Sequence, residues 1–216
     1  MIGAIFGDRL DAGRKLADAY DGPRDDVVVL GIARGGIPVG FPIALDTGAA
    51  LDVVTARKLP IPWSPEMGFG AIAPDGTMSL NEDLMPRLGL SREAIEGIAR
   101  EVLSEVHRRE NVYRGGGPPT GIADRNVILV DDGLATGYTM IASIEMVKKQ
   151  NAGYVTVAVP VGPADTAEKI EPMVDRLLVL HTARTFSFAV ASFYRDFHDM
   201  ADDEVLEFME RARATS

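Results

Sequence analysis

The sequence contains no cysteine among its 216 residues. Disulfide bonds, thiolate zinc sites, iron–sulfur clusters and cysteine nucleophiles are therefore excluded. Long apolar runs are also missing, because none approaches the roughly 18–20 residues that a membrane-spanning helix requires. The first ten residues lack a basic region, so no signal peptide is predicted there. We expect a cytoplasmic protein with no membrane partner.

Positive charge is scarce as well. The chain has 22 Lys+Arg against 32 Asp+Glu, a formal net charge of −10. This balance disfavours non-specific nucleic-acid binding, which depends on Lys and Arg neutralising phosphates, and we expect no nucleic-acid partner. A length of 216 residues with 46% hydrophobic residues favours one domain spanning residues 1–216.

Apolar runs alternate with amphipathic segments along most of the chain. The runs are rich in Val, Ile and Leu and do not alternate with polar residues, which is typical of strands buried on both faces. Strands are expected at 27–30, 51–56, 127–130, 154–161 and 177–180. Helices are expected at 8–19, from the first turn at Pro38 to Ala49, and at 91–111, 138–150, 164–173 and 202–213. This order indicates an α/β fold with a central parallel sheet flanked by helices.

One segment, residues 59–86, breaks the alternation because prolines and glycines are frequent in it. Asp75-Gly76 lies between two extended runs, 69–73 and 77–80, and predicts a β-hairpin. A long excursion of this kind in a compact domain tends to be functional. We interpret 59–86 as a loop that carries a hairpin and not as a linker between domains.

The segment Val127 to Thr139 carries the strongest chemical signal. Four apolar residues end abruptly in Asp131 and Asp132, and a turn of small residues then opens a helix. Ligands of open α/β sheets bind beyond the carboxyl ends of the strands, and a helix N-terminus attracts anions. A ribose 5-phosphate could present hydroxyls to the aspartates and its phosphate to the turn. The alternative is a strand that ends in a capping Asp before an ordinary helix.

These thirteen residues resemble the phosphoribosyl-pyrophosphate (PRPP) motif of the type I phosphoribosyltransferases: an apolar strand, two acidic residues and then Thr-Gly-x-Thr. The resemblance implies that Asp131 and Asp132 bind the ribose hydroxyls. It implies that five residues hold the 5′-phosphate: Ala135, Thr136, Gly137, Tyr138 and Thr139.

Two further segments resemble the family in order and place. The run Gly31 to Gly36 is similar to its pyrophosphate loop, which assigns Ala33, Arg34, Gly35 and Gly36 to PRPP. Arg57 and Lys58, expected at the end of the second strand, are similar to its pyrophosphate-binding basic residues, although a solvated pair would look the same. Residues 59–86 correspond to the family's flexible catalytic loop, and 182–216 to a C-terminal hood and helix. The runs Phe6–Arg9 and Glu66–Ala73 resemble one branch of predicted phosphoribosyltransferases.

The resemblance implies transfer of ribose 5-phosphate from PRPP to a nitrogenous base or related acceptor, with release of pyrophosphate. Arg34, Lys58, Asp131 and Asp132 would carry the catalysis, and Mg²⁺ would be the cofactor, near Asp131 and Asp132. A homodimer is an open expectation. The family also includes non-catalytic proteins that sense PRPP or nucleotides, and this is the alternative function.

The acceptor is not fixed by the sequence. The 6-oxopurine members of the family have an Asp immediately before Thr-Gly, whereas this chain has Ala135 there, which disfavours hypoxanthine and guanine. The acceptor site is expected in Thr185–Phe188 through Phe193 and Tyr194. Aromatic rings there would either stack on a planar base or pack in the core.

Overall fold

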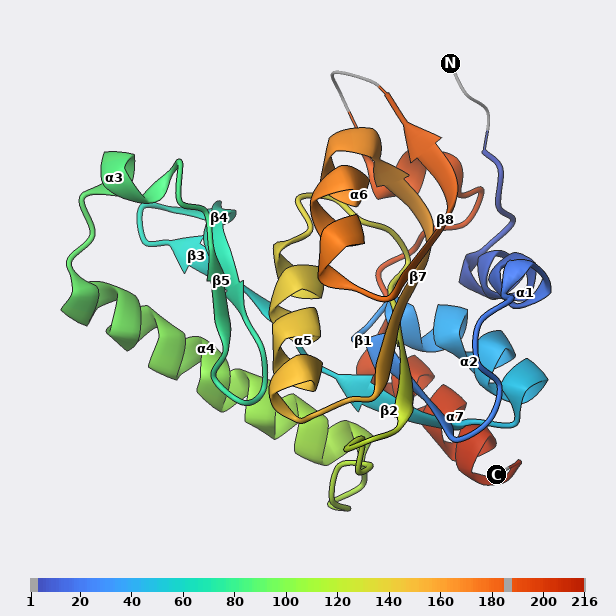
Figure 1. Ribbon diagram of the computed structural model, residues 1–216. Helices are drawn as coiled ribbons and strands as arrows, with labels where there is room; N and C mark the ends of the chain where they lie inside the picture. The colour runs from blue at the N-terminus through green and yellow to red at the C-terminus, as the bar shows by residue number, and fades with distance from the viewer. Residues whose placement is uncertain (1–3, 185–187, 216) are drawn as a thin grey trace.

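A five-stranded parallel sheet forms the centre of the protein, seen in a computed structural model that describes residues 4–184 and 188–215 (Figure 1). The strand order is β2-β1-β6-β7-β8, and every neighbouring pair is parallel. The strands are β1 (Val27–Ile32), β2 (Ala50–Val54), β6 (Asn126–Val130), β7 (Tyr154–Pro163) and β8 (Arg176–Ala183). All five strands were predicted, with shifts of at most three residues at their ends.

Apart from the half-buried edge strand β8, the sheet is buried on both faces, because its apolar side chains point alternately to opposite sides. Val27 and Val29 of β1 pack in one apolar cluster, and Val28 and Leu30 pack in the other. This explains why the predicted strands are continuous apolar runs and do not alternate with polar residues.

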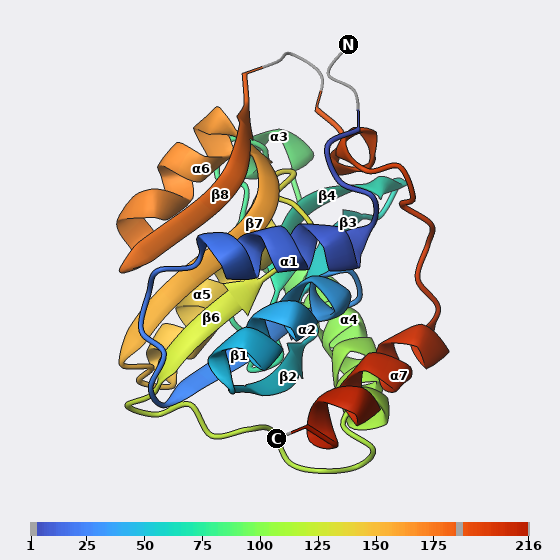
Figure 2. The same ribbon diagram turned by 90° about the vertical axis from the view of Figure 1, so that its right-hand side faces the viewer.

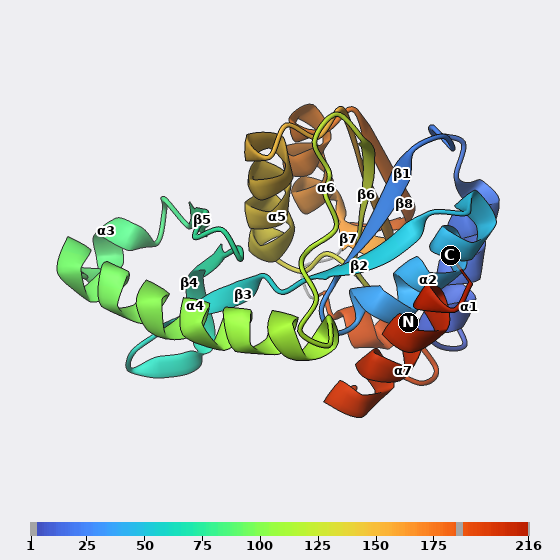
Figure 3. The ribbon, with the colours of Figure 1, turned by 90° about the horizontal axis from the view of Figure 1, so that it is seen from below.

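Helices cover both faces of the sheet. Figures 1 and 3 show α5 (Tyr138–Lys149) and α6 (Ala164–Ile170) on one face. Figure 2 shows α1 (Arg9–Ala19), α2 (Gly36–Thr47) and α7 (Asp202–Arg213) over the other. A short 3-10 turn, η1 (Glu171–Met173), follows α6, so the helix predicted at 164–173 is α-helical only in its first part. No helix in the described ranges is long and apolar enough to cross a membrane.

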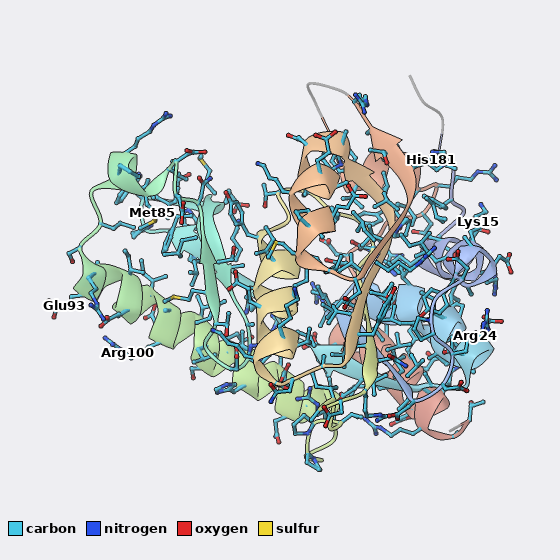
Figure 4. All side chains as sticks on the ribbon, viewed as in Figure 1. Lys15, Arg24, Met85, Glu93, Arg100 and His181 are labelled. Carbon is cyan, nitrogen blue, oxygen red and sulfur yellow. The ribbon has the colours of Figure 1, made fainter. Side chains whose placement is uncertain are left out.

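A second sheet lies beside the first, and Figure 1 shows it with α3 (Met85–Leu88) and α4 (Arg92–Tyr113) at the left. It is antiparallel and contains β3 (Arg57–Ile61), β4 (Ser64–Ile72) and β5 (Met78–Leu80). Its own apolar core includes Leu59 and Phe69, which pack with Ala99 of α4. Figure 4 shows Glu93 and Arg100 of α4 pointing outward from this part of the molecule.

The sequence predicted this region only in part. The hairpin around Asp75-Gly76 is confirmed, because Gly70 pairs with Leu80. The prediction that Arg57 and Lys58 end the second strand is wrong: β2 ends at Val54, and both residues begin β3, where Arg57 pairs with Ile72. Because this pairing partner lies fifteen residues further along the chain, the apolar pattern of 51–56 alone could not show that the strand ends early. The excursion is therefore a three-stranded sheet that starts at residue 57, and not a loop.

The N-terminal segment and the predicted hood pair with each other. Phe6 forms a parallel bridge with Tyr194, and the backbone N–H groups of Arg195 and Asp196 donate to the carbonyls of Phe6 and Gly7. A 3-10 turn, η2 (Val190–Phe193), precedes this pairing. The N-terminal segment and the predicted hood thus pack together against the last residues of β7 and β8.

Candidate functional site

Asp131 and Asp132 follow β6 directly, beside the loop that follows β1. The register pairs Gly31 with Val130, so the loop 33–36 lies next to the two aspartates. A β-carbon added to Gly35 would overlap the Oδ2 atom of Asp132, and one added to Gly36 would overlap the carbonyl oxygen of Val130. Only glycine allows this approach. The Ala33–Arg34 peptide bond in the same loop is cis.

The aspartate pair is held by a residue that we did not predict as part of the site. Arg9 Nε donates to Asp132 Oδ2 at 2.8 Å, and the two side chains are only 11% and 16% exposed. Arg9 Nη1 donates to the carbonyl of His198 at 3.0 Å, and its guanidinium lies 3.9 Å from the ring centre of Phe197. The only signal for Arg9 in the sequence was its place in the run Phe6–Arg9.

Burial dominates the electrostatics of the pair. It raises the pKa of Asp131 well above the ordinary value, and the neighbouring Asp132 carboxylate raises it further. Burial also raises the pKa of Asp132, while the hydrogen bond from Arg9 opposes this rise. Two adjacent carboxylates in a largely dry place are costly for the fold unless they have a ligand.

The turn at 135–139 opens α5 at the same edge of the sheet. Gly137 has a φ of 80°, and a β-carbon there would lie 2.8 Å from Thr166 Cγ2. Thr166 Oγ1 donates to the carbonyl of Ala135 at 3.1 Å and so fixes the turn. Thr136 is exposed, and the N-cap residue of α5, Gly137, has no side chain that could cap the helix. The first N–H groups of this helix are therefore available to an anion.

The two predicted basic residues of β3 lie differently. Arg57 Nη1 is 3.5 Å from Glu105 Oε1 of α4, and the nearby charges of Arg109 and Arg34 add to burial in lowering its pKa. Lys58 is exposed, and its ammonium donates to the carbonyl of Glu66 in the hairpin. Since successive strand residues point to opposite faces, Arg57 points toward α4 and Lys58 points away from it.

Comparison with known proteins identifies the family. The sequence profile described as "Phosphoribosyl transferase domain" matches residues 74–198, which is more than half of the chain. The chain belongs to the phosphoribosyl transferase domain family. The matched segment contains Asp131, Asp132 and the 135–139 turn, so this part of the candidate site lies within the family match.

Individual relatives agree with this family. A Mycobacterium tuberculosis protein whose name describes it provisionally as a phosphoribosyl transferase is 40% identical over 209 residues, or 96% of this chain. The match covers 47% of that protein, so the chain spans about half the length of its curated relatives. The crystal structure of TT1426 from Thermus thermophilus is 32% identical, with a TM-score of 0.78 and coverage of 95% of this chain and 98% of that one.

A more distant structure shares the fold. It is a hypothetical protein from Neisseria gonorrhoeae with bound ppGpp, 15% identical, with a TM-score of 0.50 and coverage of 99% of both chains. At this identity the likeness concerns the fold alone.

Two of the aromatic residues described in the predicted hood, 182–216, lie in an apolar core. Phe193 and Tyr194 are buried, which corresponds to the core-packing alternative for these two rings. The Tyr194 hydroxyl donates to the Asp132 carbonyl at 2.6 Å, so it supports the aspartate pair from the hood. Phe188 is half-buried against Phe193, with the ring centres 5.5 Å apart. Thr185, Phe186 and Ser187, also expected at the acceptor site, lie outside the described residues.

Proposed function

We propose that this protein transfers ribose 5-phosphate from PRPP to a nitrogenous base and releases pyrophosphate. The observation that carries the proposal is the contact between the glycine loop and Asp132, with the open N-terminus of α5 following in the same chain. One ligand with a diphosphate, a ribose diol and a 5′-phosphate would meet all three groups. Family membership supports the same reaction class.

The reaction breaks the bond between C1 of the ribose and a pyrophosphate oxygen, and it forms a bond between C1 and a ring nitrogen of the acceptor. The pyrophosphate leaves with the electron pair, and the nitrogen's proton passes to solvent. Catalysis then depends on positioning and on stabilising the charge of the leaving group. Arg34 and Arg57 would stabilise that charge, Asp131 and Asp132 would orient the ribose hydroxyls, and the turn 135–139 would hold the 5′-phosphate. Lys58 would contribute only after its side chain leaves Glu66.

The residues present fit a magnesium ion that is held largely by substrate. Among residues 4–184 and 188–215, no group of three or more His, Asp or Glu side chains forms a metal cage. Mg²⁺ commonly binds through one or two carboxylates plus substrate oxygens and water. Asp131 is the better candidate, because Asp132 already receives a hydrogen bond from Arg9. The ion would neutralise diphosphate charge when bound.

The acceptor class follows from Ala135. Its side chain is exposed where the 6-oxopurine members carry an Asp, so we propose an acceptor other than hypoxanthine or guanine. Efficient formation of guanosine monophosphate would overturn this part of the proposal.

The decisive experiment mixes the protein with PRPP, Mg²⁺ and a panel of bases and measures pyrophosphate. Release with one base establishes the transferase and names the acceptor. Calorimetry that shows no PRPP binding with Mg²⁺ present would contradict the proposal.

A second candidate function is a sensor that binds PRPP or a nucleotide without turnover. The observation that favours it is the bound ppGpp in the Neisseria gonorrhoeae protein of the same fold. Saturable binding of PRPP or ppGpp, with no pyrophosphate released for any base, would support the sensor.

A further inference from the structure

One face of α4 carries charged and hydroxyl groups toward the proposed pyrophosphate site. Glu105, Arg109 and Tyr113 are spaced by four residues, so they lie on the same side of the helix. Arg109 Nε donates to Glu105 Oε1 at 2.7 Å, and Arg57 Nη1 of β3 is 3.5 Å from the same oxygen. Glu105 therefore joins an arginine of α4 to one of β3.

The same face meets the start of α7. The buried Tyr113 hydroxyl donates to Asp202 Oδ1 at 2.6 Å, and Arg34 Nη1 is 3.6 Å from that oxygen. Burial and the Asp202 carboxylate raise the pKa of Tyr113 to about 12, so its hydroxyl keeps its proton at neutral pH. A single carboxylate oxygen thus lies between a phenol donor and the guanidinium of the glycine loop.

These groups leave an excess of positive charge in an acidic protein. Arg34, Arg57 and Arg109, which we name the arginine cluster, come from three separate elements and face two carboxylates, Glu105 and Asp202. Burial lowers the pKa of Arg57, the charges of Arg109 and Arg34 lower it further, and Glu105 opposes the shift. Such a cluster destabilises itself unless an anion joins it, and planar guanidinium groups bind phosphate oxygens with good geometry.

We propose that Arg109 and Tyr113 bind the diphosphate of PRPP together with Arg34 and Arg57, and that Asp202 occupies the place of a phosphate oxygen until the ligand displaces it. This inference rests on the proposed function and adds to it a regulation of the site by α7. When the diphosphate enters, the Tyr113 hydroxyl and Arg34 exchange a carboxylate oxygen for a phosphate oxygen. The N-terminal turn of α7 then acts as an internal competitor of the ligand.

The test is calorimetry on the full chain with inorganic pyrophosphate and with PRPP, both with Mg²⁺. Arg109→Gln removes one charge-assisted contact and should lower the affinity for both ligands by about 10-fold or more. Arg108→Gln is the matched control: Arg108 also bonds Glu105, but its side chain is 58% exposed against 24% for Arg109. The control should change affinity by less than about 2-fold. Asp202→Asn should tighten pyrophosphate binding by about 3- to 10-fold, because the competitor loses its charge.

The outcomes separate this inference from the proposed function. The inference would be overturned if Arg109→Gln and Arg108→Gln bound pyrophosphate with equal affinity, or if Asp202→Asn bound it more weakly than the wild type. This holds even if the wild type binds and turns over PRPP. Pyrophosphate binding that depends on Arg109 and Asp202 supports the inference even if no base is ever ribosylated. If Arg109→Gln does not fold, the Asp202→Asn result decides. A wild type that binds neither ligand overturns both proposals.

Discussion

The two sheets of this protein build their parts of the site in different ways. The parallel sheet places Asp131, Asp132 and the glycine loop together through strand register, because β1 and β6 are neighbours that end at the same edge. The antiparallel sheet presents Arg57 through packing on α4, and the contact with Glu105 fixes its direction. One half of the site is thus set by the central backbone, and the other half by a peripheral unit.

This difference predicts that the two sheets differ in how they unfold. The parallel sheet shares its two apolar clusters with six helices, so disturbing it should affect the whole fold. The second sheet has a small core of its own with α3 and α4, and of the described residues in its strands only Ala71 of β4 packs in a cluster of the parallel sheet. Units of this kind can open without global unfolding, and a unit that opens could admit or release a ligand.

The largest expected effects come from truncating one buried side chain in the core of each sheet. Ile128→Ala in β6 should cost about 2–5 kcal/mol of unfolding free energy, and Phe69→Ala in β4 about 3–5 kcal/mol locally; both side chains are almost completely buried. Urea unfolding and hydrogen exchange measure the difference. Phe69→Ala should expose amides of β3–β5 and α4 while β6 and β7 stay protected. Loss of protection in β6 in this variant would show that the two sheets unfold as one unit.

Asp131→Asn tests the half built by the parallel sheet. PRPP affinity with Mg²⁺ should fall about 10- to 100-fold, which corresponds to the roughly 1.5–3 kcal/mol typical of a hydrogen bond to a charged group. Without ligand, the variant should unfold at a higher temperature, because burial and Asp132 make the ionised Asp131 costly. Asp46→Asn, at an exposed ion pair with Arg24, is the control and should change neither quantity. An unchanged PRPP affinity in Asp131→Asn would remove this residue from the site.

Gly36→Ala tests the close approach of the glycine loop. The new β-carbon overlaps the Val130 carbonyl, and overpacking of this kind costs about 1–3 kcal/mol. PRPP binding should weaken as well, since the loop must move away from Asp132. Gly121→Ala has no atom within 4 Å of the new carbon and should leave stability and binding unchanged. Equal stabilities in urea for the two variants would disprove the steric argument.

The smallest expected effect is a loss of stability at acid pH, which depends on Glu105 of α4 beside the antiparallel sheet. Hydrogen bonds from Arg108 and Arg109 lower the pKa of Glu105 from 4.5 to about 2 in the folded protein. A lowered folded-state pKa adds stability that is fully present above the unfolded-state pKa and is lost as the pH falls toward about 2. The stability difference between wild type and Glu105→Gln should therefore shrink between about pH 5 and about pH 2 in urea titrations. A constant difference over this range would show that Glu105 is not held by its arginines.

Much of the fold and of the central motif was predicted from the sequence because the signals are local. Apolar runs of about four to eight residues define the strands, and the aspartate pair and the turn 135–139 lie within a segment of nine residues. The errors arose where pairing partners are distant. Arg57 and Lys58 were expected to end a strand, but the pairing of Arg57 with Ile72 makes them begin one.

The sequence by itself determined the parallel α/β class and the acidic pair at a strand end, since both depend on neighbouring residues. Only the tertiary structure decided which charges surround that pair. Arg9 reaches Asp132 across 123 positions of the chain, and Tyr113 reaches Asp202 across 89. No periodicity links residues so far apart, because such contacts are made only when strand order and helix packing bring distant segments of the chain together.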